Sequence, residues 1–143
     1  MKLFIRTALT ALACAGAVAL ATPSMAAMVN MKADLKSATE VPPNDSKGSG
    51  EVTATYDTDS KKLTWKGTYK DLTGPATAAH FHGPAEPGKN AGVAIPITPN
   101  TSPLEGTATL TPEQESDLIA GKWYVNVHTA TNKGGEIRGQ LTK

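Results

Sequence analysis

Three histidines are the residues of this sequence whose types and spacing suggest chemistry. His80 and His82 are two residues apart, so on a strand both imidazoles point to the same face, about 6 to 7 Å apart. His128 follows much later, at the end of a segment in which Tyr124 and Asn126 alternate with apolar residues. If these two segments pair as strands, the three imidazoles converge. Three neutral imidazole nitrogens suit copper or zinc, so His80, His82 and His128 are candidate metal ligands.

A second interpretation of the same histidines needs no metal. His80 and His82 would then donate hydrogen bonds to backbone carbonyls and hold the long loop over residues 83–92, which is rich in glycine and proline. The sequence leaves both interpretations open. Imidazole nitrogens within about 4 Å of one another would favour a metal, because ligands of one ion lie about 2 Å from it. Nitrogens scattered by about 8 Å or more would favour the structural role.

Three polar residues close to His128 in the sequence are candidates for supporting a metal centre without binding the metal themselves. They are Asn126, Glu136 and Arg138. Glu136 would accept a hydrogen bond from a histidine N–H, and Arg138 would attract an anion towards a metal. In the alternative interpretation, which the sequence favours, Glu136 and Arg138 form a pair on the exposed surface of the last strand. Such a pair contributes well under ~1 kcal/mol.

Short segments of alternating apolar and polar residues must position these side chains. This period of two is typical of strands with one buried face, and glycine, proline, asparagine and aspartate separate the segments. Alternation also predicts that the four residues Trp65, Trp123, Tyr56 and Tyr69 belong to the core. The expected strands are centred on residues 29–35, 52–56, 63–69, 77–82, 93–98, 106–110, 123–127 and 137–141.

One short helix is expected before the last two strands. Thr111 can cap its first turn, Pro112 suits the first helical position, Gln114 completes a capping box, and Gly121 ends it. No long helical crossover separates the strands, so a parallel sheet is not expected. The sequence therefore predicts an all-β fold: an antiparallel Greek-key sandwich or barrel of about seven or eight strands with one short helix.

The first 26 residues have the pattern of a secretory signal peptide. Lys2 and Arg6 precede an uncharged apolar run over residues 7–21, and small residues lead to a cleavage site after Ala26. We therefore expect a signal peptide over residues 1–26, a β domain over residues 27–143, and a periplasmic or secreted protein with no membrane span after cleavage. A lipid attached to Cys14 is the weaker alternative. Cleavage removes this cysteine, the only one, and with it any thiolate ligand or disulfide.

The charges of the chain exclude some classes of partner. Lysine and arginine total 14 and aspartate and glutamate total 13, and the two signs are interspersed. Because no basic run is present, we expect neither nucleic-acid binding nor attraction to an anionic membrane. A metal ion and an unidentified protein remain as the expected partners, with copper or zinc as the expected cofactor if there is one.

Four segments together resemble the CHRD domain family, which is named after chordin and is widespread in exported bacterial proteins. They are residues 40–43, 72–85, 118–129 and 134–141, and the resemblance extends over the whole chain after the signal segment. It implies an extracytoplasmic β domain but no agreed reaction. The name-giving member of the family binds signalling proteins. The resemblance therefore also implies, as one alternative, a structural or protein-interaction role for this chain.

The His-x-His pair is also similar to the copper-binding strand of copper/zinc superoxide dismutases. The further histidines and the zinc-site aspartate of those enzymes are not found here, and a disulfide is impossible with one cysteine. The hypothesis is therefore an exported, non-enzymatic binding module with a copper-type or zinc site. A dismutase-like redox enzyme and a metal-free structural module of the cell envelope are the alternatives.

Overall fold

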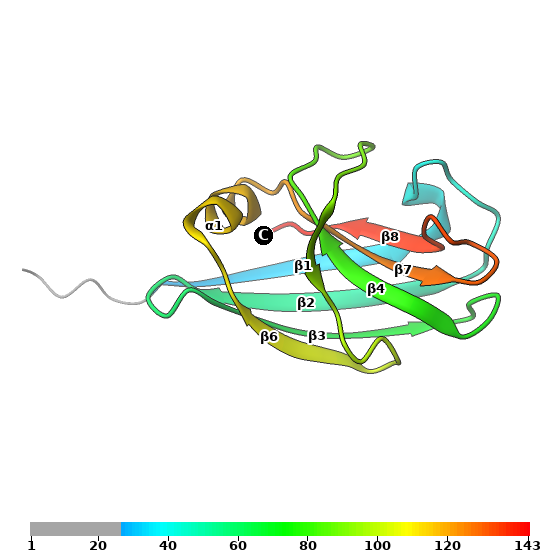
Figure 1. Ribbon diagram of the computed structural model, residues 1–143, viewed down its shortest axis with the longest axis horizontal. Coiled ribbons are helices and arrows are strands. Elements are labelled where there is room, and N and C mark those ends of the chain that lie inside the picture. Colours follow the sequence, from blue (N-terminus) through cyan, green and yellow to red (C-terminus); the bar gives the residue numbers. More distant parts are fainter. Residues whose placement is uncertain (1–26) are drawn as a thin grey trace, which may run out of the picture.

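The alternating segments fold into eight antiparallel strands, shown for residues 27–143 by a computed structural model (Figure 1). The signal peptide expected over residues 1–26, with Cys14, lies outside the described residues. The elements are β1 (Met28–Lys36), the 3-10 turn η1 (Ser37–Thr39), β2 (Ser49–Asp57), β3 (Lys62–Lys70), β4 (Ala76–His82), β5 (Val93–Pro96), β6 (Leu104–Thr109), α1 (Pro112–Ile119), β7 (Tyr124–Thr129) and β8 (Ile137–Gln140).

All eight strands belong to one sheet, in the order β5-β4-β7-β8-β1-β2-β3-β6. Strands β1, β2 and β3 follow one another as hairpins, and the chain then passes to β4, three positions beyond β1 in the sheet. The sheet curls into a nearly closed barrel, with β5 and β6 as its two edges (Figure 1). The predicted all-β antiparallel fold with one short helix is confirmed, and of the two expected forms it is the barrel.

Alternate residues of each strand fill the barrel and form its core. The indole of Trp65 meets Phe81 edge-on with ring centroids 5.1 Å apart, and Phe81 lies 6.0 Å from Trp123. Tyr56 is also fully buried, whereas Tyr69 is only partly buried. The prediction that these aromatic residues belong to the core is confirmed. Burial of an aromatic side chain contributes about 2 to 3 kcal/mol relative to exposure, so these rings supply much of the stability of a domain without disulfides.

Helix α1 begins and ends where the sequence predicts. The hydroxyl of Thr111 accepts a hydrogen bond from the backbone of Gln114, and the Gln114 side chain accepts one from the backbone of Thr111. The chain leaves the helix at Gly121, which has a φ of +74° that a glycine adopts without strain. Leu118 packs into the core, so the helix lies over one end of the barrel (Figure 1).

The outer surface of β7 is covered, which makes this part of the sheet unlike the rest. Every residue of β7 except His128 is buried, on both faces of the strand. The loop over residues 83–92 lies across it, since Tyr124 Oη contacts the backbone of Ala91 and Arg138 binds Asn90 and the carbonyl of Lys89. The Asn90 amide in turn donates to the carbonyl of Val41, which joins this loop to the one after η1.

This cover corrects one interpretation of the sequence. Glu136 and Arg138 do not form an exposed pair on the last strand, because they are 0% and 2% exposed. The polar half of an alternating strand normally faces water, but here the loops over residues 40–46 and 83–92 lie against it. Polar side chains on this face must therefore find partners within the protein.

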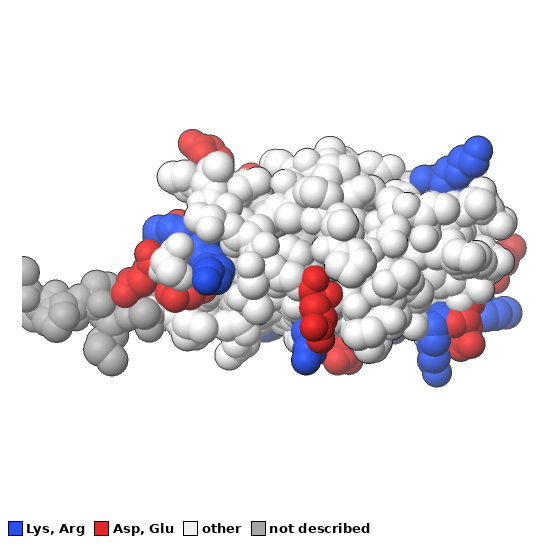
Figure 2. Space-filling model, turned by 60° about the horizontal axis from the view of Figure 1, so that its bottom comes forward, with Lys and Arg blue, Asp and Glu red and all other residues white. Residues whose placement is uncertain are grey.

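Over the described residues, no helix is long and apolar enough to span a membrane. Figure 2 shows one face of the molecule, on which acidic and basic side chains stand in small mixed groups around a largely uncharged surface. The exposed ion pairs of the described residues include Lys66 with Glu105 at 3.3 Å and Lys32 with Glu51 at 2.8 Å.

Candidate metal centre

The pairing of β4 with β7 brings the three histidines together. His80 lies opposite Asn126, His82 opposite Tyr124, and Ala78 opposite His128 in the antiparallel register. Because residues two apart share a face, His80, His82 and His128 all project from the outer surface of the barrel. The convergence that depended on this pairing is therefore observed.

The closest approach in the cluster is between His80 and His128. Nδ1 of His80 lies 3.1 Å from Nε2 of His128, and the ring centroids are 5.0 Å apart. The rings of His80 and His82 are 5.3 Å apart and nearly perpendicular. One nitrogen from each of the three residues lies within 4.8 Å of the other two. This spread is slightly above the 4 Å expected for a metal centre and far below the 8 Å expected for scattered rings.

His128 is held in the way that metal-binding histidines usually are. Its Nδ1 donates a hydrogen bond of 2.9 Å to the carbonyl of Lys133 in the turn before β8. This bond fixes the ring and leaves the lone pair of Nε2 directed at His80. Without a metal, Nδ1–H of His80 donates to that lone pair. If a metal were bound, these two nitrogens would be the ligand atoms that His80 and His128 offer it.

His82 is more completely enclosed than the other two. It is 8% exposed, and its ring stacks on Tyr124 with centroids 4.8 Å apart and an angle of 3°. Nδ1 lies 3.0 Å from the carbonyl oxygen of Ala91, and Nε2 lies 3.0 Å from Oδ1 of Asn126. Both ring nitrogens therefore already have an oxygen neighbour.

The environment of His80 and His82 favours their neutral forms. Burial lowers the pKa of His80, and the charged forms of His128 and His82 lower it further. Burial is also the main reason that the pKa of His82 is lowered, although hydrogen bonds to Ala91 and Asn126 oppose the shift. Neutral imidazole is the form that binds metal ions, so these shifts favour ligation at neutral pH.

A hollow of about 380 Å³ lies beside His80, which is the one histidine of the cluster that lines it. It lies between β4 and the segment that follows β5, and it is lined by Thr77, Ala78, Ala79, His80, Pro96, Ile97, Thr98, Pro99 and Asn100. None of these lining residues is charged, so nothing in the hollow itself would attract an anion.

Of the three predicted supporting residues, Asn126 contacts the histidine cluster directly. Its amide lies between His82 and the carboxyl group of Glu40, which the sequence did not single out. Glu40 is 4% exposed, and burial raises its pKa to about 7, although Arg138, the backbone of Val41 and the Asn126 amide lower it. Glu40 falls within a segment of the family resemblance, but alternation gives no sign that its side chain is buried.

Arg138 acts on the cluster through an intervening ring. Its guanidinium carbon lies 3.4 Å from the centroid of the Tyr124 ring, which itself stacks on His82. The guanidinium also donates hydrogen bonds to Asn90 and to the carbonyl of Lys89. Its cation–π contact and these bonds fix the Tyr124 ring, and thereby one side of His82.

Glu136 serves a different part of this surface. Its carboxylate accepts hydrogen bonds from Ser46 Oγ, Asn132 Nδ2, Thr129 Oγ1, and both the backbone and the hydroxyl of Thr73. These partners come from three loops and the last residue of β7, and they surround the start of β8. Glu136 therefore joins loops, and none of the hydrogen bonds recorded for the described residues links it to a histidine.

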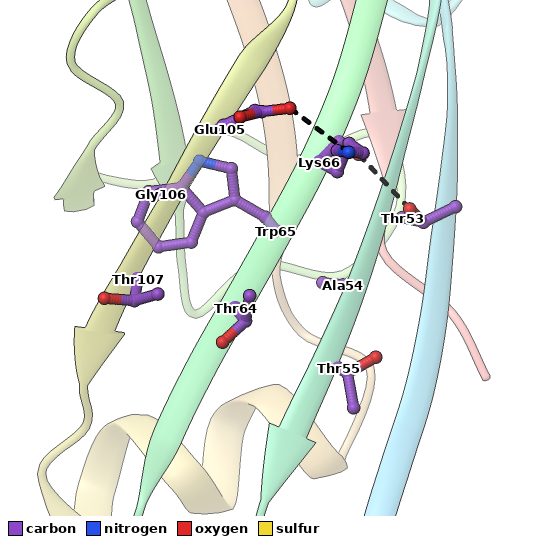
Figure 3. A pocket seen from close by; sticks show the side chains of 9 residues that line it. All are labelled: Thr53, Ala54, Thr55, Thr64, Trp65, Lys66, Glu105, Gly106 and Thr107. Atoms are coloured by element: carbon purple, nitrogen blue, oxygen red, sulfur yellow. Dashed lines mark hydrogen bonds and ion pairs between the residues drawn. The ribbon is translucent and has the colours of Figure 1, made fainter.

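A larger hollow, of about 490 Å³, lies on the outer side of β2, β3 and β6 (Figure 3). Three exposed threonines and the ion pair of Lys66 with Glu105 border it, and the indole of Trp65 packs against Gly106 of β6 beneath. Neither a histidine nor a buried unpaired charge lines it. It has the features of an ordinary solvated strand surface, whereas the histidine cluster brings three imidazoles together on a partly buried surface.

Comparison with known proteins identifies the domain but not a close relative. The family model described as the CHRD domain matches residues 31–141, which include all eight strands in whole or part and the three histidines. No curated protein and no solved structure matches this chain.

Proposed function

This chain belongs to the CHRD domain family, and we propose that it is a metal-binding module in which His80, His82 and His128 hold one copper-type or zinc ion. The proposed role is to sequester or deliver the metal. The family assignment by itself supplies no activity, so the proposal depends on the geometry of the three imidazoles.

The observation that carries the proposal is the 3.1 Å separation between Nδ1 of His80 and Nε2 of His128. Two nitrogens that each lie about 2 Å from one ion are themselves about 3 Å apart. These two residues therefore stand at ligand spacing already. His82 needs a further approach, because the cluster as a whole spans 4.8 Å.

The chemistry of the donors supports copper or zinc over calcium or magnesium. Imidazole nitrogen suits copper and zinc, whereas calcium and magnesium prefer carboxylate and carbonyl oxygens. The described residues contain no cysteine, so a thiolate does not contribute. The uncharged hollow beside His80 supports binding over an oxidation or reduction of superoxide, for which a nearby cation would guide the anion.

Calorimetric titration of the protein with Zn²⁺ and with Cu²⁺ tests the proposal. The chain has only three histidines, so each single variant His80→Ala, His82→Ala and His128→Ala removes one third of the imidazoles. We expect one-to-one binding that weakens at least tenfold in His80→Ala and His128→Ala. Thr64→Ala, on the exposed face across the barrel, is the matched control and should bind like the wild type. Binding no tighter than about millimolar, or equal in all four variants, would contradict the proposal.

A structural role for the histidines is the second candidate, and the contacts of His82 favour it. Its Nδ1 lies against the carbonyl of Ala91 in the loop over residues 83–92, and His128 holds the turn at Lys133 in the same way. In a purely structural module, His82→Ala would lower the free energy of unfolding while the wild type bound no metal. The two candidates are therefore separated by the titration of the wild type.

The proposal includes export from the cytoplasm. It is supported by the basic residues Lys2 and Arg6, the apolar run after them, and the small residues before Ala27. Expression of the full chain in a bacterium, followed by fractionation and N-terminal sequencing, tests it. We expect a periplasmic or secreted product that begins at Ala27, and a cytoplasmic product that retains Met1 would contradict it.

A further inference from the structure

Asn126 occupies the centre of the histidine cluster. In the register of β4 with β7 it lies directly opposite His80, and it is two residues from His128 on the same strand. His82 is its diagonal neighbour, and all three histidine side chains project from the same face of the sheet as Asn126. A side chain at this position is therefore adjacent to all three imidazoles.

Glu40 determines which way the amide of Asn126 points. Among the described residues, Oε1 of Glu40 has no hydrogen-bond partner, and Nδ2 of Asn126 is the donor that lies beside it, over Gly135. A carboxylate oxygen accepts hydrogen bonds and cannot donate them, so the NH₂ end of the amide faces Glu40. The carbonyl oxygen Oδ1 is left to face His82, whose Nε2 lies 3.0 Å away.

The neutral ring of His82 has one N–H for two oxygen neighbours. When the proton is on Nδ1, it is donated to the carbonyl of Ala91 at 3.0 Å, just as Nδ1 of His128 donates to a backbone carbonyl. Nε2 then directs its lone pair at Oδ1 of Asn126, and two acceptors face each other with no proton between them. The other tautomer only moves the same conflict to the carbonyl of Ala91.

A metal cation bound by both acceptors removes this conflict, and their separation suits one. Two ligand atoms that each lie about 2 Å from one ion are about 3 Å apart. Nε2 of His82 and Oδ1 of Asn126 have this spacing, at 3.0 Å. Nδ1 of His80 and Nε2 of His128 have it too, at 3.1 Å. The cluster therefore contains two pairs of atoms at ligand spacing, and each pair is formed across β4 and β7.

We propose that Oδ1 of Asn126 is the fourth ligand of the metal centre, beside the imidazole nitrogens of the three histidines. The inference rests on the proposed metal site and completes its ligand set. Four protein ligands fill a tetrahedral zinc site and leave no position for a substrate, which fits a module that holds a metal. Glu40 is a positioning residue: its carboxylate attracts the NH₂ end of the amide and so keeps Oδ1 directed at the ion.

Calorimetric titration of variants with Zn²⁺ tests the fourth ligand. Asn126→Leu keeps the size of the side chain and removes its oxygen, so the zinc affinity should fall at least about tenfold. The double variant Asn126→Asp with Glu40→Gln exchanges amide and carboxylate, keeps an oxygen directed at the ion, and should bind zinc at least as tightly as the wild type. Asn30→Leu, on the exposed face of β1, is the matched control and should change nothing. An Asn126→Leu variant that binds zinc like the wild type, or a folded exchange variant that binds ten times more weakly, would overturn the proposal.

Pulsed electron paramagnetic resonance with one equivalent of Cu²⁺ gives a readout that a merely structural role of Asn126 would not change. In protein grown on asparagine labelled with ¹³C at the amide carbon, we expect a strong ¹³C coupling to copper that disappears in Asn126→Leu. The other asparagines stay labelled in that variant and serve as the internal control. Coupling to histidine nitrogen without coupling to ¹³C would refute the fourth ligand and keep the metal site. If copper couples to neither, the proposed function fails first, and the fourth ligand fails with it.

Discussion

Replacement of Glu136 by glutamine tests whether this buried carboxylate stabilises the covered surface of the barrel. The side chain is fully buried, and five donor groups from Ser46, Thr73, Thr129 and Asn132 surround its two oxygens. Burial raises the pKa of Glu136, but hydrogen bonds from Ser46, Thr129 and Thr73 outweigh it and lower the pKa to about 2. The charged form is therefore the one that the fold requires.

The shift of this pKa gives the size of the effect. A lowering from the ordinary 4.5 to about 2 corresponds to about 3 kcal/mol at 25 °C, since each pKa unit is worth about 1.4 kcal/mol. Because the folded pKa lies below the unfolded one, this stabilisation is complete above about pH 4.5 and is lost as the pH falls towards 2. Glutamine carries no charge and cannot accept hydrogen bonds at both ends. We therefore expect Glu136→Gln to lower the free energy of unfolding by about 3 kcal/mol at pH 7.

Urea unfolding followed by tryptophan fluorescence measures this difference, because Trp65 and Trp123 are both buried. The two proteins should be compared at pH 7 and at steps down to pH 3, where the gap between them should narrow. Glu86→Gln, on an exposed loop residue with a long ion pair of 3.9 Å, is the control and should change stability by less than about 1 kcal/mol. A loss below about 1 kcal/mol in Glu136→Gln, or a gap that stays constant with pH, would refute the reasoning.

Four further predictions follow from single residues. Burial raises the pKa of Glu40 to about 7, so its contribution to stability declines as the pH rises from about 4.5 to 7. Glu40→Gln should therefore raise the free energy of unfolding by about 1 to 3 kcal/mol more at pH 8 than at pH 5, measured by urea unfolding. Gly135→Ala should lower the free energy of unfolding by at least about 2 kcal/mol, because residue 135 has a φ of +131° and a Cβ there collides with Glu40 and Asn126. An unchanged melting temperature would contradict this prediction. Thr111→Ala should cost about 1 kcal/mol through loss of the α1 cap, with Thr111→Ser as the variant that keeps it. Finally, the pKa of His80 is lowered from its ordinary 6.5, so protons compete for this imidazole only below about pH 6.5. The zinc affinity measured by calorimetry should therefore be constant around neutral pH and fall only below that value. A decline that starts at pH 8 would argue against histidine ligands.

The all-β antiparallel fold could be predicted from the sequence, although not the choice of a barrel over a sandwich, because most of the strands follow a simple rule. In β1, β2 and β3 every second residue is buried or partly buried and most of the others are exposed, as the alternation of Val29 to Leu35 and of Val52 to Tyr56 predicts. The cap of α1 was equally readable, since Thr111, Pro112 and Gln114 act on the backbone within one turn. Such features depend on near neighbours and need no knowledge of the rest of the fold.

The surroundings of the histidines could not be read in the same way. The spacing of His80 and His82 shows that they share a face, but only the register of β4 with β7 brings His128 to them. The loop that covers this face comes from residues 83–92, and its contacts with Tyr124 and Arg138 are long-range. Alternation therefore marked Arg138 as exposed, and it gave no reason to expect the carboxyl group of Glu40 behind Asn126.

Electron paramagnetic resonance of the protein with one equivalent of Cu²⁺ tests the central claim most directly, with samples grown on unlabelled and on ¹⁵N-labelled histidine. All histidines of the chain lie in the cluster, so any coupling to imidazole nitrogen reports on His80, His82 and His128. We predict a single copper species whose nitrogen couplings arise from these imidazoles, change with the label, and vanish in the triple alanine variant. A spectrum of hydrated copper, or one that the label and the triple variant leave unchanged, would contradict a metal centre formed by these three histidines.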